Sequence, residues 1–202
     1  MMRARPITAR KPRRAVLPAL GLLLVGLSAG CGGDDSGGGG GGIVTTPCVE
    51  LANAVDPVPG TVVAVDGLSG DCDELWVDVT ISGVGQPLFG VSFDLLFPTN
   101  LVALRAPDTS GSVLGSGGVP VEIITDPIPG GTNISLARFS STAAGVDVSG
   151  EHLLIRLKFI RFAGSGSGTV EFANPALFDD AEPPAEIPGV TWNGATIRII
   201  QI

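Results

Sequence analysis

The sequence predicts an all-β sandwich or barrel from Cys48 onward. Apolar and polar residues alternate along many short runs, and Gly and Pro recur between these runs. Alternation with a period of two is typical of strands that bury one face, and turn residues between such strands favour antiparallel pairing. Nine to eleven short strands within one stretch of this length are typical of a single sandwich or barrel. Nothing after Cys48 has the spacing of a helix.

The four longest runs, in chain order, are residues 75–82, 90–97, 133–140 and 152–162. Shorter candidate strands lie at 61–65, 101–105, 121–125, 169–172 and 195–202. In each long run most of the alternate residues are apolar, so we expect the side chains of that row to face the core. The expected inward residues are Leu75, Val77, Val79 and Ile81; Val91, Phe93, Leu95 and Phe97; Ile134, Leu136 and Arg138; and Leu153, Ile155, Leu157, Phe159 and Arg161.

The first 30 residues are typical of an export signal. Six Lys and Arg residues lie within the first 14 positions, and the uncharged stretch 15–30, "AVLPALGLLLVGLSAG", follows them. A basic start, a short apolar stretch and small residues before a cut form the pattern of a secretory signal peptide. The alternative is a membrane-spanning helix, but the apolar part is shorter than the roughly 20 residues that a span needs.

The end of this segment, Leu27-Ser28-Ala29-Gly30-Cys31, resembles the lipobox of bacterial lipoproteins. The resemblance implies cleavage before Cys31 and lipidation of that cysteine, and Gly32 at the next position implies sorting to the outer membrane. Residues 31–47 are rich in glycine and lack the apolar mass to fold, so we expect a flexible tether between the anchor and the domain. The predicted organisation is therefore a signal peptide (1–30), a lipidated tether (31–47) and one β-domain (48–202) in the cell envelope.

The charge of the chain argues against nucleic-acid binding. Removing the signal peptide leaves six of the 12 Lys and Arg residues against all 20 Asp and Glu residues, a formal net charge of −14. Binding to phosphate backbones needs the opposite sign.

Two cysteines remain after the predicted anchor. Cys48 and Cys72 form an even pair in an oxidising compartment, which predicts a disulfide. It would close a loop of about 25 residues and contribute roughly 3 kcal/mol in the chain-entropy model. Two free buried thiols are the alternative.

Three stretches together resemble the cohesin modules of bacterial cellulosomes and their relatives outside cellulosomes. They are "VDVTISGVGQPLFGVSFDLLFPTNLVALRA" (77–106), "TNISLARFSS" (132–141) and "SGEHLLIRLKFIRFAGSGSGTVEFANPALFDD" (149–180). The resemblance implies a jelly-roll β-sandwich of about nine antiparallel strands. It also implies a non-catalytic module that binds a protein partner, the Ca²⁺-binding dockerin. Gly90 and Ser92 stand where well-known dockerin-binding cohesins have Asn and Asp, so the sequence departs from the family at that point.

By this resemblance, the partner-binding residues are the outward row of one strand and part of its neighbour. They are Gly90, Ser92, Asp94, Leu96, Ala137 and Phe139. An apolar side chain among polar neighbours on a sheet face can anchor a partner. An ordinary solvated face is the alternative.

Other candidate sites carry weaker patterns. Acidic residues cluster at Asp71, Asp73 and Glu74 and again at Asp179, Asp180 and Glu182, where a structural Ca²⁺ is the alternative to plain turn charges. Neither cluster has the spacing of a Ca²⁺ loop, so no cofactor is predicted. His152 near Ser149 lacks the context of a catalytic pair, and no enzymatic activity is expected. Trp76 and Trp192 would favour a carbohydrate-binding module if they lined one groove; a structural domain of a surface assembly is the third alternative.

Overall fold

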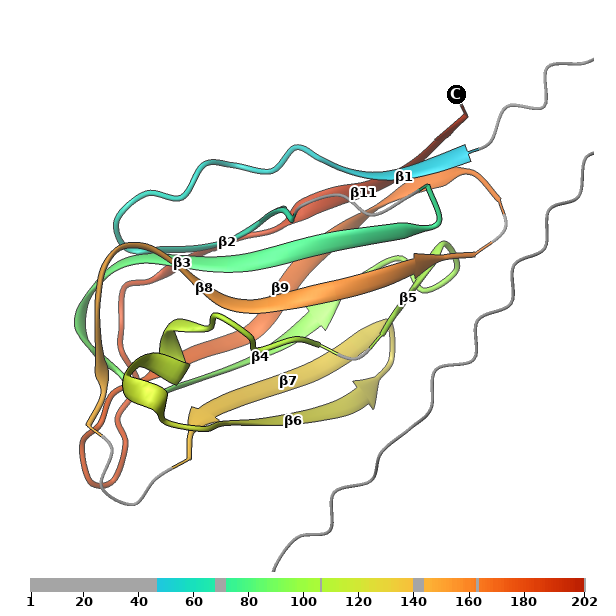
Figure 1. Ribbon diagram of the computed structural model, residues 1–202. Coiled ribbons are helices and arrows are strands. Elements are labelled where there is room, and N and C mark those ends of the chain that lie inside the picture. The colour runs from blue at the N-terminus through green and yellow to red at the C-terminus, as the bar shows by residue number, and fades with distance from the viewer. Residues whose placement is uncertain (1–46, 68–71, 106, 140–143, 163, 202) are drawn as a thin grey trace, which may run out of the picture. The chain divides into compact units, whose positions relative to one another are not determined.

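The protein is described by a computed structural model that covers residues 47–67, 72–105, 107–139, 144–162 and 164–201. These residues form two β-sheets packed face to face (Figure 1). The six-stranded sheet has the order β1 (Pro47–Ala52), β11 (Ala195–Gln201), β9 (Gly166–Phe178), β4 (Gly90–Leu96), β7 (Gly131–Arg138), β6 (Val121–Ile128). The five-stranded sheet has the order β10 (Thr191–Asn193), β2 (Thr61–Asp66), β3 (Glu74–Leu88), β8 (Val146–Arg161), β5 (Val102–Leu104). The predicted all-β sandwich is confirmed.

The core lies between the two sheets and consists of the inward residues of their strands. Phe93 and Phe159, one from each sheet, are fully buried, as are their inward neighbours. The inward rows predicted for residues 75–81 and 134–138 are confirmed, including the buried Arg138. In the row predicted for residues 91–97, Val91, Phe93 and Leu95 are buried, whereas Phe97, just after β4, is half-buried and packs against Phe159. Period-two alternation therefore identified the core correctly wherever the ladder is regular.

One inward row was predicted wrongly at its start. The β3–β8 ladder shifts register between Val79 and Thr80, where it passes from Ile155 to Leu153. The extra residue, Leu154, is fully buried, whereas Leu153 is only half-buried. A β-bulge adds one residue to a strand and so reverses the faces on one side of it.

The described residues contain eleven strands, within the nine to eleven that the sequence predicts, although the candidate runs did not include β1 and β10. Two further features differ from the prediction. Strand β10 runs parallel to β2, so the sheets are not wholly antiparallel. A short 3₁₀ helix, η1 (Val113–Gly118), begins after Ser112, whose hydroxyl accepts a hydrogen bond from the backbone N–H of Leu114.

A disulfide joins Cys48 in β1 to Cys72, just before β3, with the two Cα atoms 4.1 Å apart. The predicted pairing is confirmed, and it links a strand of one sheet to the segment that leads into the other.

The predicted signal peptide, Cys31 and nearly all of the tether lie outside the described residues. Within the described ranges, no helix is long and apolar enough to cross a membrane.

Candidate functional site

The candidate site lies on the outer face of the six-stranded sheet, the side that points away from the five-stranded sheet. Strand β4 is central there, between β7 and β9. The register places Gly90 beside Ala137 of β7 and Phe178 of β9, and Ala137 in turn lies beside Glu122 of β6. Residues from four strands therefore meet in one row across the sheet.

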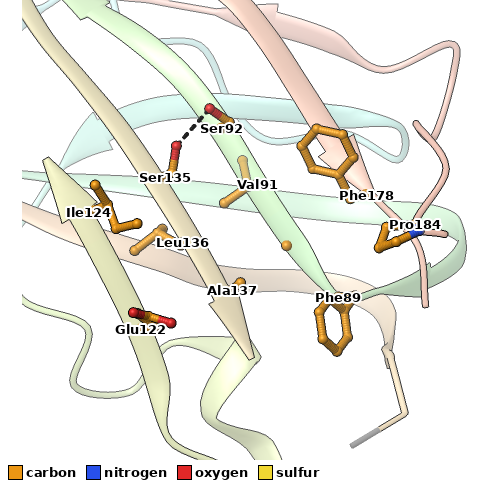
Figure 2. A pocket seen from close by; sticks show the side chains of 11 residues that line it. Phe89, Val91, Ser92, Glu122, Ile124, Ser135, Leu136, Ala137, Phe178 and Pro184 are labelled. Carbon is orange, nitrogen blue, oxygen red and sulfur yellow. Dashed lines mark hydrogen bonds between the residues drawn. The ribbon is translucent and has the colours of Figure 1, made fainter. Parts of the chain in front are cut away.

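This row and the next one enclose an apolar groove of about 340 Å³ (Figure 2). A Cβ atom at Gly90 would lie 3.0 Å from the carbonyl oxygen of Leu136 and 3.5 Å from the Cβ of Ala137. The small residues Gly90 and Ala137 thus keep the floor of the groove low, and larger apolar side chains stand around them. The lining residues are Phe89, Gly90, Val91, Ser92, Glu122, Ile124, Ser135, Leu136, Ala137, Phe178 and Pro184.

Polar side chains that are fixed by one another border the groove. The hydroxyls of Ser92 and Ser135 lie 2.9 Å apart across β4 and β7 (Figure 2). One row further along, the amide groups of Asn133 and Asn174 each donate to one carboxylate oxygen of Asp94, both at 2.7 Å. These side-chain hydrogen bonds, with Asn133 the larger cause, lower the pKa of Asp94 from its ordinary value. These two adjacent rows of polar side chains together are called the polar row below; its residues are Ser92, Ser135, Asn133, Asp94 and Asn174.

A bulge in β9 brings Asn174 to Asp94. The β4–β9 ladder shifts register between Ser92 and Asp94, and Asn174 has a positive φ of 47°. Asparagine tolerates this left-handed conformation better than most residues. The irregularity therefore directs a second amide towards the carboxylate.

The structure places all six predicted partner-binding residues on this outer face, but not in one cluster. Gly90, Ser92 and Ala137 line the groove. Asp94 lies in the polar row, and Leu96 lies at the far end of β4, beside Gly131 and Glu171.

Phe139 follows the end of β7 and is 65% exposed. It lines a second depression together with Pro120, Val121 and Glu122. The large exposed ring therefore lies at the opposite end of the face from Leu96.

Sequence reasoning missed the contributions of β6 and β9. Ile124 is 54% exposed and lines the groove, although it was placed only in a short candidate strand. The adjacent pair Ile123-Ile124 was the available signal, because two consecutive apolar residues in a strand must face opposite sides. Phe178 and Asn174 had no such signal, because the candidate strand was drawn only to residue 172 and β9 runs on to Phe178.

The acidic clusters serve local structure where they are described. Asp73 pairs with Arg161 and Glu74 with Lys158, each at 2.6 Å, while Asp71 lies outside the described residues. The carboxylate of Asp179 accepts the backbone N–H groups of Ala181 and Ala185, and that of Asp180 accepts the N–H of Gly145. Across the described part of the chain, no three His, Cys, Asp or Glu side chains converge in a way that could hold a metal ion.

The remaining candidates lie apart from one another. His152 Nε2 lies 2.9 Å from the backbone carbonyl of Ser149, not from its hydroxyl. Trp76 lies on β3, where the amino group of Lys158 is 5.2 Å from its ring centroid. Trp192 packs against Phe93 and Phe172 at centroid distances of 5.7 and 5.3 Å. The two tryptophans therefore do not line one groove.

Comparison with known proteins gives similarities of fold only. No model of a protein family matches the chain, and no curated protein sequence matches it. Among solved structures, a cohesin from Clostridium acetobutylicum is 19% identical, with 77% of this chain and 90% of that chain covered and a TM-score of 0.46. A non-cellulosomal cohesin from the archaeon Archaeoglobus fulgidus is 14% identical, with 73% and 88% covered and a TM-score of 0.46. A type I cohesin–dockerin complex from Clostridium thermocellum gives 8% identity, 78% and 96% coverage and a TM-score of 0.49.

Proposed function

We propose that this chain is a lipid-anchored protein of the bacterial cell envelope whose β-domain binds a protein partner on the outer face of its six-stranded sheet. The supporting observation is the apolar groove at Gly90 and Ala137 with the polar row beside it. The proposed anchor is Cys31, and the proposed location is the outer membrane or the cell surface.

The groove and the polar row suit a protein partner for two physical reasons. An apolar side chain that enters the groove would be desolvated by Phe89, Ile124 and Phe178, which is how binding hot spots gain their energy. The polar row is already fixed by hydrogen bonds before a partner arrives, so less side-chain entropy is lost on binding. A flat sheet carries both features without a deep pocket, which suits a folded surface better than a small molecule.

Dockerin modules are the first partner class to test. The sequence resembles cohesins, and the Clostridium thermocellum cohesin is described in complex with a dockerin. The face on this chain differs in its residues at Gly90 and Ser92, so we propose dockerin binding as a class and leave the specificity to experiment.

The experiment compares Ala137→Arg with Ala103→Arg. Ala137 lies on the floor of the groove, whereas Ala103 lies in β5, on the other sheet, beside Ile160. Isothermal titration against a panel of dockerins, with and without Ca²⁺, should show that the unchanged protein binds. The affinity should fall at least about tenfold in Ala137→Arg, because the new side chain fills the space that an apolar side chain of the partner would occupy. Ala103→Arg should bind as the unchanged protein does. Equal loss in both variants, or no loss in either, would contradict docking on this face.

A separate experiment tests the anchor. Cells expressing the chain are labelled with an alkyne-bearing fatty acid and then fractionated. The unchanged protein should carry the label and remain in the membrane fraction, and Cys31→Ala should lose both, because stable attachment needs several acyl chains. Label retained in Cys31→Ala would overturn the proposed anchor without affecting the proposed binding face.

A further inference from the structure

The free edge of β6 carries a second binding possibility. β6 is the last strand of the six-stranded sheet, and its only strand partner among the described residues is β7 (Figure 1). Its eight residues are mostly exposed. An exposed edge presents unpaired backbone groups that can accept another strand.

The register identifies which backbone groups point outward. The N–H of Phe139 donates to the carbonyl of Pro120 at 2.8 Å, and Val121 is paired with Arg138. Because bonded and non-bonded pairs alternate in an antiparallel ladder, the even-numbered residues of β6 bond to β7. The N–H and C=O groups of Val121, Ile123 and Thr125 therefore point to the free edge. Pro127 also faces the free edge, so its lack of an N–H removes no hydrogen bond between β6 and β7.

The side chains of β6 define what such a strand should carry. Glu122, Ile124 and Asp126 follow one another on the outer face, and all three are exposed. An added strand would place alternate side chains beside them at the close spacing of cross-strand neighbours. Opposite charges stabilise such pairs and like charges destabilise them. The complementary strand would therefore carry a basic residue, an apolar residue and a second basic residue, each separated from the next by one residue of any kind.

The same charges disfavour pairing between two copies of this chain. In the two-fold register that pairs the whole strand with itself, Ile124 would face Ile124 and each Glu122 would face an Asp126. Two like-charge pairs would then oppose the contact.

We propose that β6 is a docking edge for an extended segment of a partner protein with this basic–apolar–basic pattern. The segment adds a seventh strand beside β6 and bonds to Val121, Ile123 and Thr125. The side chains of the added strand that point away from the outer face would lie at the opening between the two sheets. A space of about 310 Å³ lies there, lined by Leu104, Arg105, Pro107, Thr125, Pro127 and Thr132. This mode of binding goes beyond the docking on the sheet face and does not require it.

The test is hydrogen exchange of the full chain, with its disulfide intact, in the presence of a short peptide with the central sequence Lys-Thr-Ile-Thr-Lys. The amide protons of Val121, Ile123 and Thr125 should exchange at least about tenfold more slowly at saturating peptide, because they gain backbone acceptors. Those of Glu122 and Ile124, already bonded to β7, should change little. A peptide with Glu in place of both Lys residues should bind about tenfold more weakly.

Two variants separate edge pairing from other contacts. Thr125→Pro removes one edge N–H without removing a bond to β7 and should weaken binding of the Lys peptide, whereas Thr125→Val should not. The double variant Glu122→Lys with Asp126→Lys should reverse the preference in favour of the Glu peptide, which tests the charge pattern even if Thr125→Pro fails to fold.

The edge proposal fails if the Lys peptide gives no protection at Val121, Ile123 and Thr125. It also fails if those amides are protected in the absence of peptide to an extent that rises with protein concentration, which would show self-pairing. Asp94→Ala changes the polar row of the sheet face, two strands away from the edge, and should leave the protection of Val121, Ile123 and Thr125 by the peptide unchanged. Loss of docking on the sheet face can therefore be distinguished from loss of edge pairing.

Discussion

Arg138 shows how one residue can join two elements of the sandwich. It lies at the end of β7, is 8% exposed, and donates hydrogen bonds from its guanidinium to the carbonyls of Leu114 and Ser116 in η1. A buried charge is costly unless such partners satisfy it. The guanidinium thus holds the 3₁₀ helix against the sheet.

We expect Arg138→Ala to lower the free energy of unfolding by about 2–4 kcal/mol, because it leaves two carbonyls without donors and opens a void. Urea unfolding measures this. Arg198→Ala is the control, since its pair with Glu50 at 3.3 Å is half-exposed and is worth about 0–1 kcal/mol. Similar losses in both variants would show that Arg138 has no special role.

Asp94 carries a prediction about pH. Its two amide donors favour the ionised carboxylate and lower its pKa from the ordinary value. A group with a lowered folded-state pKa contributes stability above its unfolded pKa and loses it as the pH falls through the folded value. The hydrogen bonds to Asp94 should therefore persist at neutral and mildly acidic pH and be lost only when the pH falls below the ordinary pKa of an aspartate.

The measurement is an NMR titration of the Asp94 carboxyl carbon. In the unchanged protein its midpoint should lie below the ordinary range for aspartate, and in the double variant Asn133→Ala with Asn174→Ala it should rise towards that range. An unchanged midpoint in the double variant would show that the two amides are not the cause.

At the scale of elements, the edge strands and bulges are the parts that local pattern does not reveal. The positions of β1 and β10 depend on β11 and β2, which lie far from them in sequence. The bulge near Leu154 and the irregularity near Asn174 each change which residues share a face. Such local departures follow from how two strands fit together, not from the composition of either one.

The disulfide Cys48–Cys72 is a further tie at this scale. It links β1, an edge strand, to the start of β3 across a sequence separation of 24 residues. Changing both cysteines to serine should lower the free energy of unfolding by roughly 3 kcal/mol, because the unfolded chain regains the entropy of an open loop.

Thermal and urea unfolding of the double variant, compared with Ser149→Ala as an exposed surface control, would measure the loss. We expect the sheet order to survive, since the core residues of both sheets are unchanged. A loss no larger than that of the control would mean that the bond does not restrict the unfolded chain.

At the scale of the whole molecule, charge distinguishes this protein from a neutral sandwich. The part of the chain that follows the predicted cleavage site carries a net charge of −14, and the proposed docking edge presents Glu122 and Asp126. A field of one sign attracts partners of the opposite sign and is screened by salt.

We therefore expect the association rate of the Lys-Thr-Ile-Thr-Lys peptide to fall about tenfold between 50 and 500 mM salt. Stopped-flow fluorescence with a labelled peptide measures the rate. The same peptide with Gln in place of both Lys residues should show little dependence on salt. If both peptides respond alike, long-range attraction does not guide binding.

The sequence by itself determined the fold class, most of the core and the disulfide pairing. Alternating side chains such as Val91, Phe93 and Leu95 specify a buried face directly, because a strand turns every second residue to the same side. The even cysteine count and the oxidising compartment that the leader predicts favoured a Cys48–Cys72 pair over two free thiols, and the structure contains that pair.

Only the tertiary structure decided how the candidate site is assembled. Gly90 became the floor of a groove because Ala137, Ile124 and Phe178 come to lie around it from three other strands. Asp94 became the centre of a polar row because the bulge in β9 brings Asn174 to it from 80 residues away. Strand order and register set these contacts, and both arise from the packing of distant segments, which no local run of residues encodes.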